Sequence, residues 1–126
     1  MNILAIDYGT KRIGLAWVDT ALGVVLPFGV IRQSDFRFQT SAITDLVKRE
    51  KIDQIVVGFP IGLDGGENEN TVKVCAFIDQ LKSEVRLPIA TVDERFTTHQ
   101  AARAERGVSA DERAAMIILQ SYLDRH

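Results

Sequence analysis

The chain has 126 residues, which predicts a single domain spanning residues 1–126. Its composition, 46% hydrophobic and 25% charged, is that of a globular protein and excludes a mainly disordered chain. A net charge of −2 argues against a general nucleic-acid coat protein, although a local basic site remains compatible with it. One cysteine excludes an intrachain disulfide, and one cysteine with two histidines excludes a Cys/His zinc cluster.

No apolar stretch is long enough to cross a bilayer, and the N-terminus lacks the basic region of a signal peptide. We therefore expect a cytoplasmic protein that has no membrane partner.

The first quarter of the chain predicts three strands joined by short turns. The strands cover residues 2–7, 13–18 and 29–32, with turns at residues 8–12 and 19–23. The first strand ends on the carboxylate Asp7, and Gly9 relieves the backbone of the turn that follows. Parallel strands need a crossover of about a dozen residues, so these short connections predict an antiparallel meander.

Helical and strand patterns alternate along the rest of the chain. Helices are predicted over residues 36–50, around 72–81, over 97–107 and over 109–124, and strands over residues 54–58 and 89–92. The second of these helices is expected to face the core with Val72, Cys75, Ala76, Ile78 and Leu81. The order βββαβαβαα implies parallel crossovers and an α/β sheet covered by helices on both faces.

Carboxylates gather where α/β sheets usually bind ligands, outside the carboxyl ends of the strands. Asp7 ends the first strand, Glu94 follows the last, and Asp111 continues the apolar stripe of the final helix, so all three are predicted at one edge. Oxygen ligands of this kind suit Mg²⁺ or Mn²⁺. Two alternatives stay open: Asp7 caps a turn, and Asp111 complements the helix dipole beside a capping box formed by Ser109 and Glu112.

Basic residues flank these carboxylates along the chain, namely Lys11, Arg12, Arg95, Arg103 and Arg106. A basic rim around an acidic centre suits a phosphodiester, because the cations hold phosphates while bound metals supply the chemistry. The alternative for Arg103 and Arg106 is that they are exposed helix charges.

Four sequence blocks carry a family resemblance along almost the whole chain. They are residues 5–16 (AIDYGTKRIGLA), residues 55–60 (IVVGFP) with Asp64-Gly65, residues 93–98 (DERFTT), and Asp111 with residues 114–123 (AAMIILQSYL). Jointly they resemble the YqgF/RuvX family of Holliday-junction-resolvase-like proteins, to which nucleases of the 16S ribosomal RNA precursor are assigned. The resemblance implies an RNase H-like fold with a five-stranded mixed sheet in the order 3-2-1-4-5.

The resemblance also implies a metal-dependent nuclease that acts on an RNA precursor or on branched DNA. Its catalytic and metal-binding residues would be Asp7, Glu94 and Asp111, with Asp7 shared by two Mg²⁺ or Mn²⁺ ions about 3.5–4 Å apart. The residues expected to bind substrate are Lys11, Arg12, Arg95 and Thr97. A monomer and a homodimer are both compatible with this reading.

The chain departs from the family pattern in two places. Residues 106–110 carry one basic residue where family members often have a basic run, and Val18 precedes Asp19 where Ser is usual. The first departure weakens the case for nucleic-acid binding through that loop, so a non-catalytic RNA-binding or ribosome-assembly adaptor stays open as an alternative. Residues 7–10 also resemble the first phosphate loop of actin-like and sugar-kinase-like ATPases, but that fold needs two such domains and this chain is too short.

Overall fold

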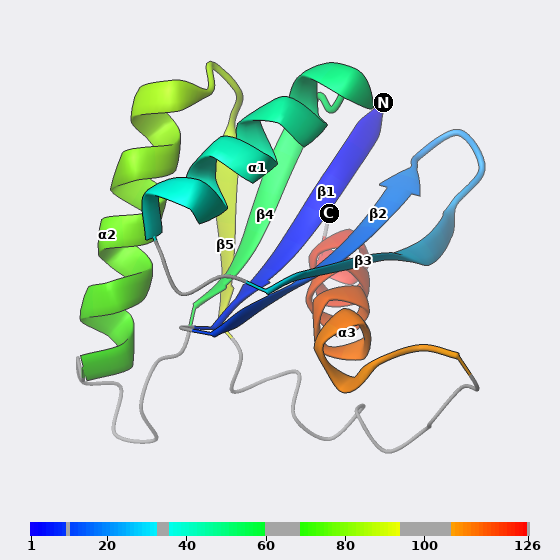
Figure 1. Cartoon of the computed structure of the whole chain (residues 1–126). Coiled ribbons are helices and arrows are strands. Elements are labelled where there is room, and N and C mark those ends of the chain that lie inside the picture. Colours follow the sequence, from blue (N-terminus) through cyan, green and yellow to red (C-terminus); the bar gives the residue numbers. More distant parts are fainter. Residues whose placement is uncertain (10, 33–35, 60–68, 94–106, 126) are drawn as a thin grey trace.

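The computed structural model describes residues 1–9, 11–32, 36–59, 69–93 and 107–125 (Figure 1). Its elements are β1 (Asn2–Tyr8), β2 (Arg12–Asp19), β3 (Val24–Arg32), α1 (Phe36–Arg49), β4 (Gln54–Phe59), α2 (Glu69–Glu84), β5 (Ile89–Asp93) and α3 (Ala110–Arg125). Their order agrees with the sequence pattern. The helix predicted over residues 97–107 falls almost entirely outside the described residues.

The five strands form one mixed sheet in the order β3-β2-β1-β4-β5, which confirms the predicted topology. The strands β1, β2 and β3 are an antiparallel meander, whereas β4 lies parallel to β1 and β5 lies parallel to β4. The strands β1, β4 and β5 therefore finish at the same end of the sheet, at Tyr8, Phe59 and Asp93. We call this the carboxyl end of the sheet.

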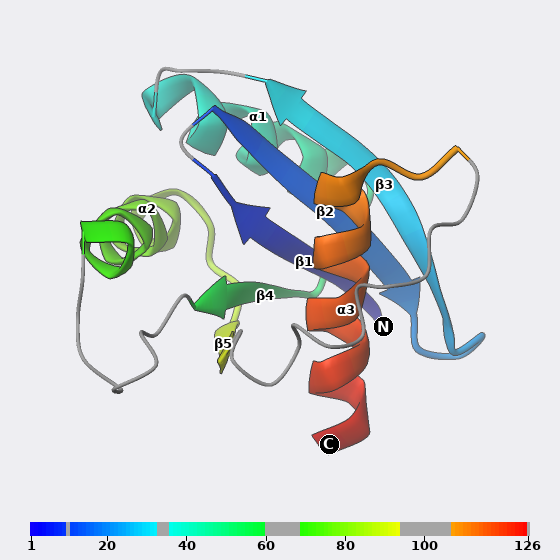
Figure 2. The same cartoon turned by 90° about the horizontal axis from the view of Figure 1, so that it is seen from below.

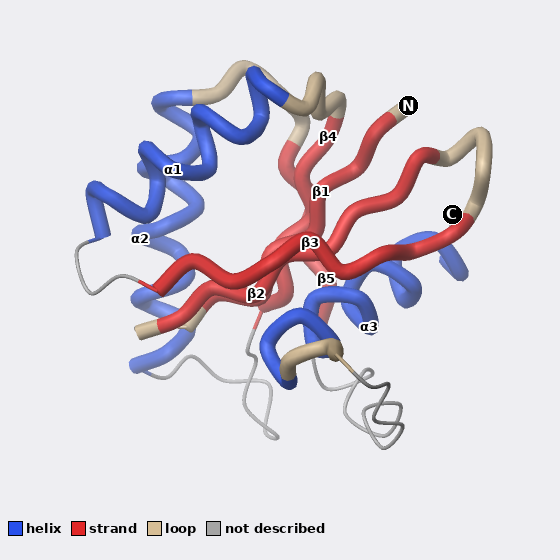
Figure 3. Tube along the Cα trace, turned by 45° about the vertical axis from the view of Figure 1, so that its right-hand side comes forward, coloured by secondary structure: helices blue, strands red, loops and turns tan. Residues whose placement is uncertain are grey.

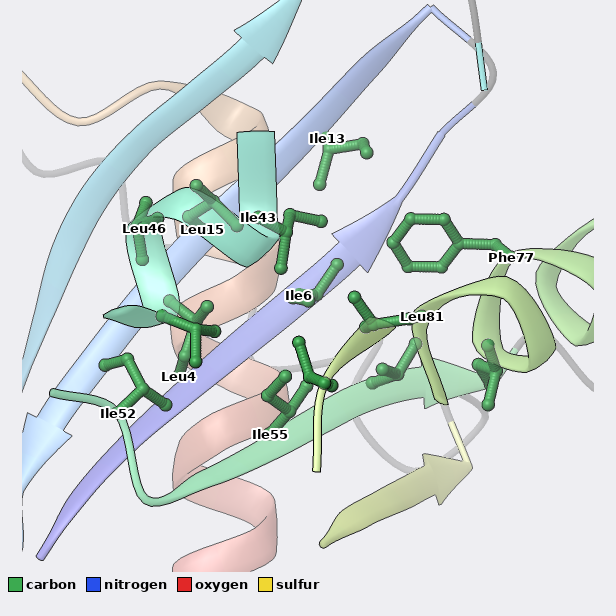
Figure 4. Close-up of a cluster of buried hydrophobic side chains, with 14 of the residues drawn as sticks. Leu4, Ile6, Ile13, Leu15, Ile43, Leu46, Ile52, Ile55, Phe77 and Leu81 are labelled. Atoms are coloured by element: carbon green, nitrogen blue, oxygen red, sulfur yellow. The ribbon is translucent and has the colours of Figure 1, made fainter. Parts of the chain in front are cut away.

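Helices cover both faces of the sheet, as the sequence predicts (Figures 1 and 2). On one face, α1 and α2 pack over the larger core cluster, which includes Leu4, Ile6, Ile13, Leu15, Ile43, Phe77 and Leu81 (Figure 4). On the other face, α3 is the one helix among the described residues, and it packs over a second cluster, which includes Ile3, Ala5, Ala16, Val18, Val56, Ile118 and Leu119. Side chains alternate between faces along a strand, so Asp7, two residues after Ala5, is on the α3 face.

The start of α3 is fixed by the capping box predicted from the sequence. The backbone N–H of Glu112 donates to Ser109 Oγ at 3.1 Å, and Ser109 donates from its hydroxyl to Glu112 Oε1 at 3.0 Å. The backbone N–H of Ser109 reaches the same oxygen at 3.3 Å. This reciprocal arrangement satisfies backbone donors that a helix otherwise leaves unpaired, and it sets the position of the first turn, which contains Asp111.

The predicted core face of α2 was correct at Ile78 and Leu81 and wrong at Val72, Cys75 and Ala76. Val72 is 60% exposed and Cys75 is also exposed, whereas Val74, Phe77 and Leu81 are buried. The true stripe recurs at three- and four-residue spacing around Phe77, whose ring lies 4.5 Å from that of Tyr8. Burying the large Phe77 ring removes more apolar surface from water than burying Cys75 or Ala76, so the aromatic side chain sets the rotation of the helix.

The third strand is longer than predicted and begins at Val24 rather than near Gly29. Two features hide it in the sequence. It contains Pro27, which a sheet accepts because β3 is an edge strand, and it exposes Val24 and Leu26 to solvent.

None of the helices within the described ranges is long and apolar enough to span a membrane.

Candidate active site at the carboxyl end of the sheet

Two of the three predicted site residues, Asp7 and Asp111, lie next to Gly14. Asp7 lies directly opposite Gly14 in the β1–β2 ladder. The main chain of Asp111 packs against Gly14 from the α3 side, and its Cβ would lie only 3.0 Å from a Cβ placed on that glycine. Paired residues on antiparallel strands are about 4.5–5.5 Å apart at Cα, so the geometry brings Asp7 and Asp111 onto one small area of the α3 face.

Gly14 makes this approach possible because it has no side chain. Any Cβ at this position would overlap with the carbonyl group of Asp111, whose atoms belong to the backbone of α3 and cannot rotate away. The packing therefore depends on glycine for space rather than for an unusual backbone angle. The sequence indicates only a glycine in an apolar strand, and the contact across 97 positions becomes visible only in the folded chain.

Arg12 forms an ion pair with Asp111, with 3.3 Å between Arg12 Nε and Asp111 Oδ2. The side chain of Arg12 is 58% exposed and that of Asp111 is 28% exposed, so water screens the pair and its contribution to stability is small. The main effect of the pair is on the position of the Asp111 side chain, because the Arg12 guanidinium holds the carboxylate toward β2. This contact joins Arg12 to Asp111, one of the proposed metal ligands. It does not test the prediction that Arg12 binds substrate.

Tyr8 ends β1 on the opposite face from Asp7 and closes the larger core beneath the site. Its ring packs against Phe77 with an interplanar angle of 31°. Burial raises the pKa of the Tyr8 hydroxyl above its ordinary value of 10.0, so the phenol stays neutral under physiological conditions. Tyr8 therefore supports the end of β1 without adding charge to the site.

The remaining predicted site residues divide into two groups. Lys11 is exposed and precedes β2 at the same end of the sheet. Glu94, Arg95 and Thr97 lie outside the described residues, and so do Arg103 and Arg106. One charged residue that the sequence pattern did not single out, Arg32, ends β3 directly opposite Arg12. Only the strand register reveals it, since Arg32 belongs to none of the sequence blocks that predict the site.

The chemistry of Asp7 and Asp111 fits a divalent cation. Both offer carboxylate oxygens, the donors that Mg²⁺ and Mn²⁺ prefer, and they converge from a strand and a helix that Gly14 lets pack closely. Within the described ranges no group of three metal-ligating side chains of the His, Cys, Asp or Glu type occurs, so this part of the chain supplies two of the three proposed ligands.

A cavity of about 320 Å³ lies at the other end of the sheet. It is lined by α1, by the last residue of α2 and by the connection between α2 and β5, namely by Thr44, Val47, Lys48, Glu84, Val85, Arg86 and Leu87. It contains neither Asp7 nor Asp111, so it is separate from the candidate active site.

The strand order β3-β2-β1-β4-β5, with α1 and α2 on one face of the sheet and α3 on the other, is that of a RuvC-like RNase H fold. The structure matches the RuvC protein of T. thermophilus in complex with a Holliday junction substrate, with a TM-score of 0.68 over 99% of this chain and 96% of that one, at 14% sequence identity. It also matches the Holliday junction resolvase of fowlpox virus, with a TM-score of 0.63 over all of both chains, at 11% identity.

The sequence comparisons specify the family within that fold. Residues 1–125 match the RuvX family model, described as Holliday junction resolvase. A protein of Dictyoglomus turgidum is 39% identical over 98% of this chain and 94% of its own length, and one of Rickettsia typhi is 35% identical over 97% and 84%. Both relatives bear the name "Putative pre-16S rRNA nuclease". The chain belongs to the RuvX family, which confirms the resemblance carried by its four sequence blocks.

Proposed function

We propose that this protein is a metal-dependent nuclease that hydrolyses phosphodiester bonds in a precursor of 16S ribosomal RNA. The observation that carries the proposal is the meeting of Asp7 and Asp111 at Gly14, at the carboxyl end of the sheet. The family supports a nuclease, and the names of the relatives support the RNA precursor as substrate. Branched DNA is the second substrate to test, because the matched family and fold include Holliday junction resolvases.

In this proposal Asp7, Glu94 and Asp111 would hold the divalent cations. When bound, such ions lower the pKa of a water molecule and stabilise the oxygen that leaves the phosphate. Asp111 contributes from a helix whose first turn is locked by the capping box, and Asp7 contributes from the central strand of the sheet. Ligands on such rigid elements keep their spacing when the cations are absent.

The basic side chains hold the nucleic-acid backbone over these carboxylates. Lys11 and Arg12 begin β2 beside the site, and we assign them, together with Arg95 and Thr97, to phosphate binding. Contacts of this kind supply affinity and orientation rather than sequence choice. The pairing of Arg12 with Asp111 additionally keeps one of these cations close to the proposed metal ligands.

A metal titration combined with a cleavage assay tests the proposal. A 5′-extended 16S rRNA fragment and a four-way DNA junction are incubated with the protein in Mn²⁺, in Mg²⁺ and in EDTA. We expect cleavage of the RNA with either ion, none in EDTA, and at least a hundredfold loss in Asp7→Asn. Asp45→Asn is the matched control, because Asp45 is an exposed carboxylate on α1, on the other face of the sheet.

Two outcomes contradict the proposal in different ways. Preferential cleavage of the junction would replace the RNA precursor by branched DNA as the substrate. RNA binding in EDTA with no cleavage under any condition would instead favour the adaptor function, which the single basic residue within residues 106–110 leaves open.

A further inference from the structure

Arg32 occupies a defined place beside the candidate site, on the side away from β4 and β5. It is the last residue of β3 and pairs directly with Arg12, the first residue of β2. The strands β2 and β3 lie side by side (Figure 3). The neighbouring pair, Ile13 and Ile31, packs into the core under α1 and α2. Because side chains alternate between the faces of a sheet, Arg12 and Arg32 are both on the α3 face, with Asp7 and Gly14.

Two arginines directly opposite each other on one face are unfavourable unless an anion lies between or beside them. Arg12 has such an anion in Asp111. Arg32 is exposed, and among the described residues it makes no ion pair. Within the described part of the chain, Arg32 is therefore a guanidinium with no ion-pair partner on the β3 side of the site, at the same end of the sheet as Asp7 and Asp111.

The strand spacing shows which part of a substrate Arg32 can reach. Arg32 lies two strands away from Asp7 across the sheet, which is about 10 Å between Cα atoms. It also lies two residues further along the strand direction, which adds about 7 Å in that direction. That separation places Arg32 to one side of Asp7 and Asp111 rather than between them. It suits a neighbouring phosphate of the same strand, and the guanidinium fork matches two phosphate oxygens.

We propose that Arg32 binds a backbone phosphate of the nucleic-acid substrate next to the one that is cut, so that the bound strand crosses β1, β2 and β3 at the carboxyl end of the sheet. The proposal rests on the proposed function and adds the direction in which the bound nucleic-acid strand runs over the sheet. The positive charge lacking from residues 106–110 is supplied by the ends of β2 and β3.

Salt-dependent binding gives a readout that does not depend on cleavage. The affinities of a labelled single-stranded RNA and a labelled four-way DNA junction are measured by fluorescence anisotropy between 50 and 200 mM salt, in EDTA and with Ca²⁺ in place of Mg²⁺. We expect Arg32→Ala to lower affinity about fivefold or more and to reduce the slope of log K against log salt by about 0.7–0.9, the loss of one phosphate contact. Arg32→Lys should restore part of the affinity, because it restores the charge but not the fork.

Arg86→Ala is the matched control. Arg86 is also exposed, loses the same charge on substitution, and precedes β5 at the opposite end of the sheet. It should leave the affinity and the salt slope unchanged. A thermal melt supplies the structural check: Arg32→Ala should keep or raise the melting temperature, because it removes a like-charge pair.

Three results would overturn the assignment. Wild-type affinity and slope in Arg32→Ala would remove Arg32 from the substrate path while leaving the nuclease proposal intact. Equal losses in Arg32→Ala and Arg86→Ala would show that only total charge matters. Failure of the unmodified protein to bind either nucleic acid would contradict the nuclease proposal and the Arg32 assignment together.

Discussion

Gly14 of β2 and Asp111 of α3 are in contact through their main chains, with no side chain between them. The glycine faces Asp7 across the β1–β2 ladder, so one small residue sets the distance between two carboxylates on different elements. Larger residues are accepted two and four positions further along β2, where Ala16 and Val18 belong to the same buried cluster as Ile118 and Leu119 of α3. The requirement for glycine is therefore specific to the turn that holds Asp111.

Gly14→Ala should push the first turn of α3 away from the sheet. Overpacking of this kind costs about 1–3 kcal/mol of stability, and the displaced Asp111 should lower Mn²⁺ affinity by about tenfold. Isothermal titration at a temperature where the variant is folded measures the affinity. Val18→Ala is the control, since it loses about 2 kcal/mol by removing buried methyl groups far from Asp111 and should keep normal Mn²⁺ affinity. Equal Mn²⁺ affinity in both variants would contradict the positioning role of Gly14.

Adding Mn²⁺ should raise the melting temperature of the unmodified protein, because a ligand that binds only the folded state stabilises it. The gain is about 2.7 kcal/mol when the ion is at one hundred times its dissociation constant. Asp7→Asn should lose this gain and should melt at the same or a higher temperature in EDTA, because repulsion between carboxylates is relieved. A full Mn²⁺-induced shift in Asp7→Asn, measured by calorimetry, would exclude Asp7 as a ligand.

Arg12→Gln separates the two proposed effects of the Arg12 guanidinium, its ion pair with Asp111 and its binding of RNA. Without the guanidinium, Asp111 is free for the metal, so Mn²⁺ affinity should stay the same or rise, whereas RNA affinity should fall. The exposed pair contributes under about 1 kcal/mol, so stability in EDTA should change little. Arg49→Gln is the control, because Arg49 forms a comparable exposed pair with Glu50 away from the site. Loss of Mn²⁺ affinity in Arg12→Gln would show that Arg12 is needed to position Asp111 for the ion.

Ser109→Ala should weaken the start of α3. Loss of the N-cap hydroxyl costs about 1 kcal/mol, and fraying of the first turn should lower Mn²⁺ affinity as well, since Asp111 is in that turn. Thermal melts and titrations of Ser109→Ala and Ser83→Ala measure both effects. The hydroxyl of Ser83 donates to the Gln80 carbonyl oxygen within α2, so Ser83→Ala should leave metal binding normal. If Ser109→Ala keeps full Mn²⁺ affinity despite lower stability, the cap holds the helix but not the ligand.

The sequence predicts most of the fold because its apolar runs are either continuous or clearly periodic. The antiparallel meander and the parallel crossovers follow from the lengths of the connections, whereas the strand order was implied by the family resemblance, and the structure confirms both. The phase of α2 could not be predicted, since Val72 and Phe77 are both apolar and only the contact with Tyr8 decides which of them faces the sheet. The start of β3 is hidden by Pro27, which is acceptable only in a strand already known to lie at the edge.

The candidate site likewise has some features that the sequence predicts and others that only the folded structure shows. Asp7 and Asp111 could be chosen from strand ends and helix stripes, and the structure brings both to Gly14. The contact itself and the cross-strand pairing of Arg12 with Arg32 depend on strand register and helix depth. These are tertiary properties that spacing along a single segment does not contain. The roles of Glu94, Arg95 and Thr97 stay predictions.

In the described part of the chain, the helix that covers the second face of the sheet is also the last element, and this order affects how the protein forms. Asp7 and Asp111 are 104 positions apart (111 − 7), and the sheet can assemble from residues that all precede the helix. A growing chain that stops before residue 110 would expose Ala5, Ala16, Val18 and Val56 and would hold only half of the paired carboxylates. Docking of the last helix would therefore close the apolar face and bring Asp111 to Asp7 in one step, so a chain that has not finished folding should be unable to cut nucleic acid.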